Sequence, residues 1–137
     1  MCENVINLLY MDIDQKKKIL IVDDDGSLRN VLKDKISQEG FTALTAGDGE
    51  EGLKIGIKEK PDLILLDVIM PKINGIKMLK KLREDEWGKH VPVLLLSNDD
   101  DPEHIRETLK DNATDYLIKS DWELEDIIKK IKETLRL

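Results

Sequence analysis

Four large apolar residues in a row, Leu63 to Leu66, followed directly by Asp67, constrain the fold more than any other feature of the sequence. A run without polar alternation is typical of a strand covered on both faces, in the middle of a parallel sheet. Pro71 is expected to stop the strand soon after the acid. Asp67 is therefore predicted at the carboxyl end of a buried strand, where open α/β sheets bind ligands. Taken alone, it suits a helix or turn cap equally well.

Three further apolar runs also end in polar residues. They are Lys18 to Val22 before Asp23, Asp24 and Asp25; Val91 to Leu96 before Ser97; and Tyr116 to Ile118 before Lys119. The carboxyl ends of parallel strands meet at one edge of a sheet, so these polar side chains are predicted to converge on one site.

Apolar residues at helical spacing separate the predicted strands. The stripes are Leu28, Val31, Leu32 and Ile36; Ile76, Leu79 and Leu82; Ile105, Leu109 and Ala113; and Leu124, Ile127, Ile128, Ile131 and Leu135. A weaker helix is predicted at 50–60, where Gly52 and Gly56 each cost up to about 1 kcal/mol relative to alanine.

Cap residues mark the expected helix ends. Asn74 precedes one predicted helix, and Gly40 and Asn112 are expected as left-handed caps at the ends of two others. Ser120 and Glu123 are predicted to form a capping box before the last helix.

Strand and helix alternate five times, counting a short strand at 41–46 that suits a sheet edge. This pattern predicts an α/β fold, a flavodoxin-like doubly wound sheet of five parallel strands in three αβα layers, with strand order 2-1-3-4-5. The first and third strands would then be neighbours, and Asp23, Asp24 and Asp67 would meet. Residues 17–137 are expected to form this domain. Residues 1–16 are expected to form a flexible arm, or to dock on a partner or on the domain.

Composition narrows the function classes. The 22 basic and 29 acidic residues give a net charge of −7, so direct nucleic-acid or anionic-membrane binding is not expected. A single cysteine, Cys2, excludes an internal disulfide and a multi-cysteine metal site. No apolar segment approaches the roughly 20 residues needed to span a bilayer, and the first residues do not resemble a signal peptide. A cytoplasmic protein is expected.

The converging residues suit phosphoryl chemistry. Three neighbouring carboxylates repel one another by several kcal/mol per pair even at an effective dielectric constant of about 20, and a divalent cation removes this repulsion. All-oxygen ligands beside an open crevice favour Mg²⁺ or Mn²⁺. Lys119 and Ser97 offer a positive charge and a hydroxyl donor for an anionic group. Asp67 is then the candidate nucleophile, which would form an acyl phosphate.

Two other kinds of site are not supported. The sequence has no glycine-rich loop of the Gly-x-x-x-x-Gly-Lys-Ser kind, so nucleotide triphosphate binding is not expected. His90 and His104 are predicted in a loop and on an acidic helix, as surface residues rather than catalytic bases.

In order and spacing, residues 18 to 136 resemble the receiver domain of two-component response regulators, the CheY-like fold. The matching motifs are Asp23-Asp24, Asp67 with Met70-Pro71 and Gly75, Ser97, and Tyr116-Leu117-Ile118-Lys119. The resemblance implies that Asp67 accepts phosphate from the phosphohistidine of a histidine kinase or phosphotransfer protein. It implies that Mg²⁺ is held by Asp23, Asp24, Asp67 and the backbone carbonyl of Ile69. It also implies that Ser97 and Lys119 sense the phosphoryl group, and that Tyr116 is a switch aromatic.

Three positions depart from the family pattern. Ser120 stands where many relatives have a proline in a cis peptide, so the loop after Lys119 is expected to differ. Asn98 is bulkier than the usual residue and would narrow access to Asp67. Asp25 leaves open which two of the three successive acids bind the cation, and we favour Asp23 and Asp24.

The resemblance also implies that the side chain of Ile69 lies beside the phosphoryl group, where a polar residue can help to orient the water that hydrolyses it. Ile69 cannot orient a water molecule as a polar residue could, which predicts a long-lived phosphorylated state unless Asp99 orients the water instead. Ile69 also stands where a haloacid dehalogenase-type phosphatase would need a second aspartate.

We therefore predict a stand-alone receiver that signals to an unknown downstream protein through a switched protein-binding face. Its own chemistry would be phosphoryl acceptance and slow self-dephosphorylation, not enzymatic turnover. The alternative is a degenerate receiver that acts as a constitutive binding module. The sequence allows either a monomer or a phosphorylation-dependent dimer.

Overall fold

The computed structural model describes residues 16–68, 74–97, 115–118 and 123–137. Its five strands form one parallel sheet in the order β2-β1-β3-β4-β5. The strands are β1 Lys18–Val22, β2 Thr42–Ala46, β3 Leu63–Asp67, β4 Val93–Ser97 and β5 Asp115–Ile118. The helices are α2 Gly26–Gln38, α3 Gly49–Glu59, α4 Gly75–Glu84 and α6 Leu124–Leu135. The predicted fold class and strand order are confirmed.

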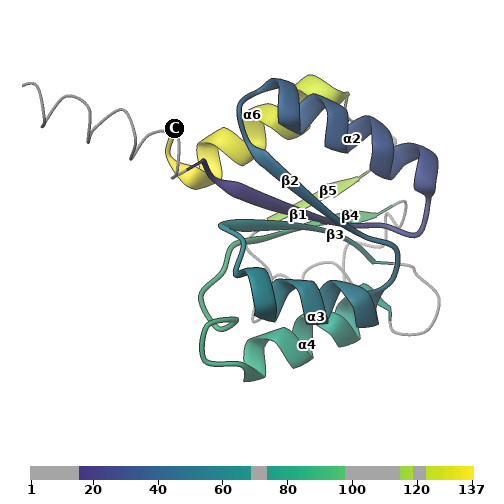
Figure 1. The fold of residues 1–137 in the computed structure, drawn as a ribbon, viewed down its shortest axis with the longest axis vertical. Coiled ribbons are helices and arrows are strands. Elements are labelled where there is room, and N and C mark those ends of the chain that lie inside the picture. Colours follow the sequence, from purple (N-terminus) through teal and green to yellow (C-terminus); the bar gives the residue numbers. More distant parts are fainter. Residues whose placement is uncertain (1–15, 69–73, 98–114, 119–122) are drawn as a thin grey trace, which may run out of the picture.

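Helices cover both faces of the sheet (Figure 1): α2 and α6 lie on one face, and α3 and α4 lie on the other. Successive side chains of a strand point to opposite faces, so each central strand contributes to two apolar cores. Ile19 and Ile21 of β1 pack with α2 and α6, whereas Leu20 and Val22 pack with α4. This explains why the strands read as continuous apolar runs rather than as alternating sequences.

The central strand β3 is buried along its whole length, including Asp67. It lies between β1 and β4, with Leu66 opposite Val22 and Asp67 opposite Leu96. The apolar run identified from the sequence is therefore the middle of the sheet, and its terminal carboxylate emerges at the carboxyl edge.

Gly52 lets α3 pack closely against the sheet. The sequence alone indicates only that this glycine destabilises the helix. A Cβ on residue 52 would stand 2.9 Å from both γ-carbons of Val22 and 3.2 Å from Cε of Met78. Only a residue without a side chain lets α3 approach β1 this closely. Gly56 has more room, because its nearest such neighbour is 3.6 Å away.

Two predicted helix ends are confirmed. Gly40 follows the end of α2 with a φ of +92°, and the Asn74 carboxamide oxygen accepts from the Lys77 N–H at 2.9 Å before α4. The predicted capping box is wrong in position. The last helix has Glu123 as its N-cap, and the Asp126 carboxylate accepts from the Glu123 N–H at 2.8 Å. The helix thus begins later than the Ser120 pattern suggested.

The predicted inner stripe of α2 is too wide. Leu32 and Ile36 are buried, but Val31 is 46% exposed. The helix contacts the sheet along positions four residues apart, and Val31 lies about 100° around the axis from Leu32. Within the described helices, none is long and apolar enough to cross a membrane. Two expected features lie outside the described residues: the helix with the stripe Ile105, Leu109 and Ala113 and its cap at Asn112, and residues 1–15 of the arm.

Candidate functional site

Three carboxylates converge at the carboxyl edge of the sheet. Asp23 and Asp24 directly follow β1, and Asp67 ends the neighbouring strand β3. Each offers a ligand oxygen, and these oxygens all lie within 4.8 Å of one another. Asp23 and Asp67 are only 1% and 6% exposed, whereas Asp24 is exposed. Two buried acids beside an exposed third suit a cation that is bound by protein on one side and by water on the other.

Asp23 is held through its backbone and its side chain. Its N–H donates to the Ala46 carbonyl oxygen at 3.1 Å, which ties the end of β1 to the end of β2. Its Oδ1 accepts from the Asp25 N–H at 2.9 Å, and its carbonyl oxygen accepts from Nη1 of Arg29 at 2.8 Å. The turn after β1 is therefore fixed on several sides.

Asp25 caps a helix. Its Oδ1 accepts from the N–H groups of Ser27 and Leu28 at 3.0 and 3.3 Å, so it is the N-cap of α2. It is also outside the cluster of three converging carboxylates. Of the three successive acids, the structure thus brings Asp23 and Asp24, the favoured pair, together with Asp67.

Gly75 explains how α4 can start against the site. A Cβ on residue 75 would stand 2.2 Å from the carbonyl oxygen of Asp67, which no real side chain could do. Its N–H donates to the Val68 carbonyl oxygen at 2.8 Å. The glycine in the motif after Asp67 is therefore required by close backbone approach.

The other predicted site residues are described only in part. Ser97 ends β4, where its backbone is in register with Ile118, and Tyr116 in β5 is in register with Leu95. The structure thus places the end of β4 beside that of β3, and the end of β5 beside that of β4. The other residues discussed from the sequence lie outside the described residues: Ile69, Asn98, Asp99, His104, Lys119 and Ser120.

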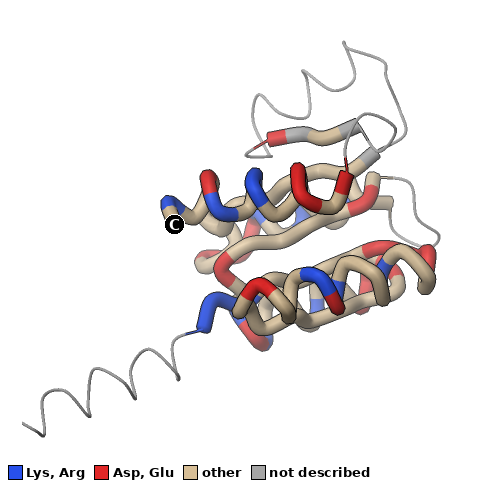
Figure 2. Tube along the Cα trace, turned by 90° about the horizontal axis from the view of Figure 1, so that it is seen from above, with Lys and Arg blue, Asp and Glu red and all other residues tan. Residues whose placement is uncertain are grey.

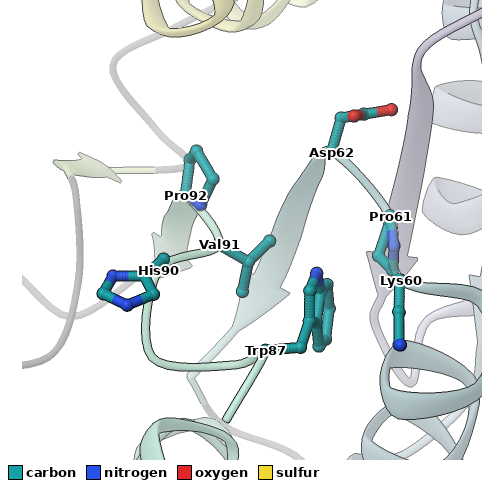
Figure 3. A pocket seen from close by; sticks show the side chains of 7 residues that line it. All are labelled: Lys60, Pro61, Asp62, Trp87, His90, Val91 and Pro92. Atoms are coloured by element: carbon teal, nitrogen blue, oxygen red, sulfur yellow. The ribbon is translucent and has the colours of Figure 1, made fainter.

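His90 lies at the opposite end of the sheet. It lines a surface cavity of about 330 Å³ beside residues that precede β3 and β4. Figure 3 shows the indole of Trp87 between Val91 and Pro61 in this cavity. The structure therefore does not bring His90 together with the three carboxylates.

Charges of both signs are mixed on the surface. Figure 2 shows Lys and Arg interspersed with Asp and Glu along the described helices on both sides of the sheet. Several are paired across elements, such as Lys132 with Glu39 at 3.0 Å and Lys130 with Asp115. The described helices therefore present a mixed charged surface rather than one of a single sign.

Comparisons with known proteins identify the family. Residues 19–132 match the model of the response regulator receiver domain. The alkaline phosphatase synthesis transcriptional regulatory protein PhoP of Bacillus subtilis is 38% identical over 120 residues, covering 88% of this chain and 49% of that protein. A probable transcriptional regulator, ycf27, of Guillardia theta is 37% identical over 125 residues, covering 90% and 48%. The chain spans about half the length of these curated relatives.

Solved structures give the same result. The chemotaxis response regulator CheY4 of Vibrio cholerae has a TM-score of 0.81 at 31% identity, covering 87% of this chain and 98% of that one. A CheY-like receiver domain protein of Methanospirillum hungatei has a TM-score of 0.82 at 28% identity, covering 89% and 95%. The chain belongs to the receiver domain family of two-component response regulators. Domains of this family are generally phosphoacceptors, and they bind Mg²⁺ in an acidic pocket.

Proposed function

We propose that the protein accepts a phosphoryl group on Asp67, with Mg²⁺ or Mn²⁺ bound by Asp23, Asp24 and Asp67. The observation that carries this proposal is the convergence of three carboxylates with ligand oxygens within 4.8 Å of one another. At such distances their mutual repulsion amounts to several kcal/mol per pair at an effective dielectric constant of about 20. An all-oxygen set of this kind, half buried and beside an open edge, fits a hard divalent cation.

The proposed donor is a phosphohistidine on a histidine kinase or phosphotransfer protein. An oxygen of the Asp67 carboxylate attacks phosphorus, the new P–O bond forms, and the P–N bond to imidazole breaks. The imidazole leaves as a neutral ring after taking up a proton. A bound Mg²⁺ would neutralise charge that develops on the phosphoryl oxygens. Burial of Asp67 at the tip of a stiff central strand holds the attacking oxygen in place.

Ser97 and Lys119 are proposed to bind the phosphoryl oxygens once the group is on Asp67. Charge-assisted hydrogen bonds to the new dianion would supply the differential stabilisation that a conformational switch needs. We propose that Ser97 moves toward the phosphate, that Tyr116 turns inward, and that the surface around β5 and α6 changes. Amide shifts on adding beryllofluoride test this step. Shifts confined to the residues around Asp67 would contradict it.

The output is proposed to be contact with another protein, with dephosphorylation as the only other chemistry. Among the matched proteins, some are named as transcriptional regulators and others as chemotaxis response regulators. The changed surface of the receiver domain itself would make this contact.

Intact-mass measurement tests the proposed reaction. Acetyl phosphate with Mg²⁺ is expected to add the mass of one phosphate to the protein. Excess EDTA is expected to abolish the addition, because uncompensated carboxylates repel the incoming anion. An unmodified wild-type protein with Mg²⁺, or modification undiminished by EDTA, contradicts the proposal.

A further inference from the structure

We infer that Arg29 is a positioning residue for the cation-binding carboxylates, an inference that rests on the proposed function. Arg29 lies in the first turns of α2, six residues after Asp23. Its Nη1 reaches back over the connecting turn and donates to the carbonyl oxygen of Asp23 at 2.8 Å. It would act on the cation through the backbone between Asp23 and Asp24, without contacting the cation itself.

The contact holds the backbone carbonyl group of Asp23. The Asp23 N–H is held by the Ala46 carbonyl, and its Oδ1 is held by the Asp25 N–H. In both contacts the partner of Asp23 is a main-chain group, whereas the partner of its carbonyl oxygen is the Arg29 side chain. The carbonyl group forms the peptide unit that leads to Asp24, so the Arg29 guanidinium sets the orientation of the unit joining two proposed ligands.

Arg29 also lies against a second turn at the same edge. A Cβ on Gly47 would stand 3.5 Å from Nη1 of Arg29 and 3.8 Å from Oε2 of Glu51. The same Glu51 oxygen accepts from the Gly47 N–H at 3.1 Å, which fixes the turn between β2 and α3. The half-buried guanidinium thus lies between the turn that follows β1 and the turn that follows β2.

The charge and the hydrogen bond of Arg29 act in opposite directions. A guanidinium near the site repels a divalent cation, so its charge alone lowers cation affinity. A hydrogen bond that orients a ligand-bearing turn raises cation affinity, and removing such outer partners typically costs about 10- to 100-fold. The sign of the change on substitution therefore separates the two roles.

Mg²⁺ binding to the unphosphorylated full chain, measured by isothermal titration calorimetry, tests the inference. Arg29→Gln is expected to raise the Kd for Mg²⁺ about tenfold. Arg29→Lys keeps the charge and a nitrogen that can donate a hydrogen bond. Its Kd is expected to lie between those of wild type and Arg29→Gln. Lys33→Gln is the matched control, because it removes an exposed positive charge one turn along the same helix. It is expected to leave the Kd unchanged or slightly lower.

Circular dichroism without Mg²⁺ shows whether each variant is folded. If Arg29→Gln is not folded, the Kd of Arg29→Lys tests the inference instead. A Kd for either Arg29 variant equal to or below that of wild type overturns the inference while leaving the proposed function intact. A wild-type protein that does not bind Mg²⁺ at all overturns the proposed cation site, and the inference with it.

Discussion

Gly52 of α3 lies against Val22 of β1 so closely that a Cβ on residue 52 would stand 2.9 Å from both γ-carbons of the valine. A methyl group at this position is expected to cost about 1–3 kcal/mol, because the helix must move away from the sheet. Alanine's better helix propensity recovers about 1 kcal/mol, so Gly52→Ala is expected to lower the free energy of unfolding by up to about 2 kcal/mol.

Urea denaturation measures the effect, and Gly56→Ala in the same helix is the control. The nearest atom to a Cβ on residue 56 is Cδ2 of Leu20 at 3.6 Å, an ordinary contact. Gly56→Ala is expected to stabilise the protein by up to about 1 kcal/mol. Two substitutions with the same effect would show that close approach to Val22 is not what requires glycine.

Asp24 and Asp25 are predicted to have separable roles. Asp24→Asn is expected to weaken Mg²⁺ binding strongly with little change in stability. Asp25→Ala is expected to cost about 1 kcal/mol of stability through loss of the α2 cap, with a much smaller effect on Mg²⁺. Calorimetry and urea denaturation on both variants make the comparison, with Asp25→Ser as a variant that keeps a capping oxygen. Loss of Mg²⁺ binding in Asp25→Ser would contradict the assignment.

Glu39 links α2 to α6 and is expected to titrate at low pH. The hydrogen bond and charge of Lys132 hold the pKa of the Glu39 carboxyl below its ordinary value, with a smaller contribution from Lys35. Because the folded pKa is the lower one, the stabilisation is present above the ordinary pKa of glutamate and is lost as pH falls through the lowered value. Carboxyl NMR titration is expected to show a raised Glu39 pKa in Lys132→Met. An unchanged pKa in Lys132→Met, or an equal rise in the exposed control Lys129→Met, would contradict the link.

The lifetime of phosphorylated Asp67 stays a prediction from the sequence, since Ile69 and Asp99 lie outside the described residues. Replacing Ile69 with Asn is expected to speed decay by roughly ten- to hundredfold, the effect of regaining one positioning interaction of about 1–3 kcal/mol. Decay after removal of the phosphodonor measures it. An unchanged or longer half-life in Ile69→Asn would show that Ile69 does not slow hydrolysis. Slower decay in Asp99→Ala alone would show that Asp99 orients the attacking water.

The sheet could be predicted from the sequence because strands that are buried on both faces consist of continuous apolar residues. Continuous apolar runs ending in polar residues identified β1, β3 and β4, and the alternation with helices predicted their order. The convergence of Asp23, Asp24 and Asp67 follows from that order, since all three stand at neighbouring strand ends.

Features that depend on tertiary distances were missed or misread. The Arg29 side chain bonds to a backbone carbonyl, and such a contact leaves no pattern of residue types. Gly52 was read as a helix weakness because close approach to a strand is not visible in a single helix. Val31 fits the helical spacing, yet the narrow contact of α2 with the sheet leaves it exposed.

The central claim is that Asp67 alone accepts phosphate, and mapping the modified residue tests it most directly. Asp62 precedes the same strand that Asp67 ends, so Asp62→Asn is the matched control for Asp67→Asn. After acetyl phosphate and Mg²⁺, borohydride reduction and peptide mass spectrometry are expected to find the modification only at Asp67. Asp62→Asn should be labelled as wild type is, and Asp67→Asn should carry no label. Label at another aspartate of the wild-type protein, or equal labelling of Asp67→Asn, would contradict the account.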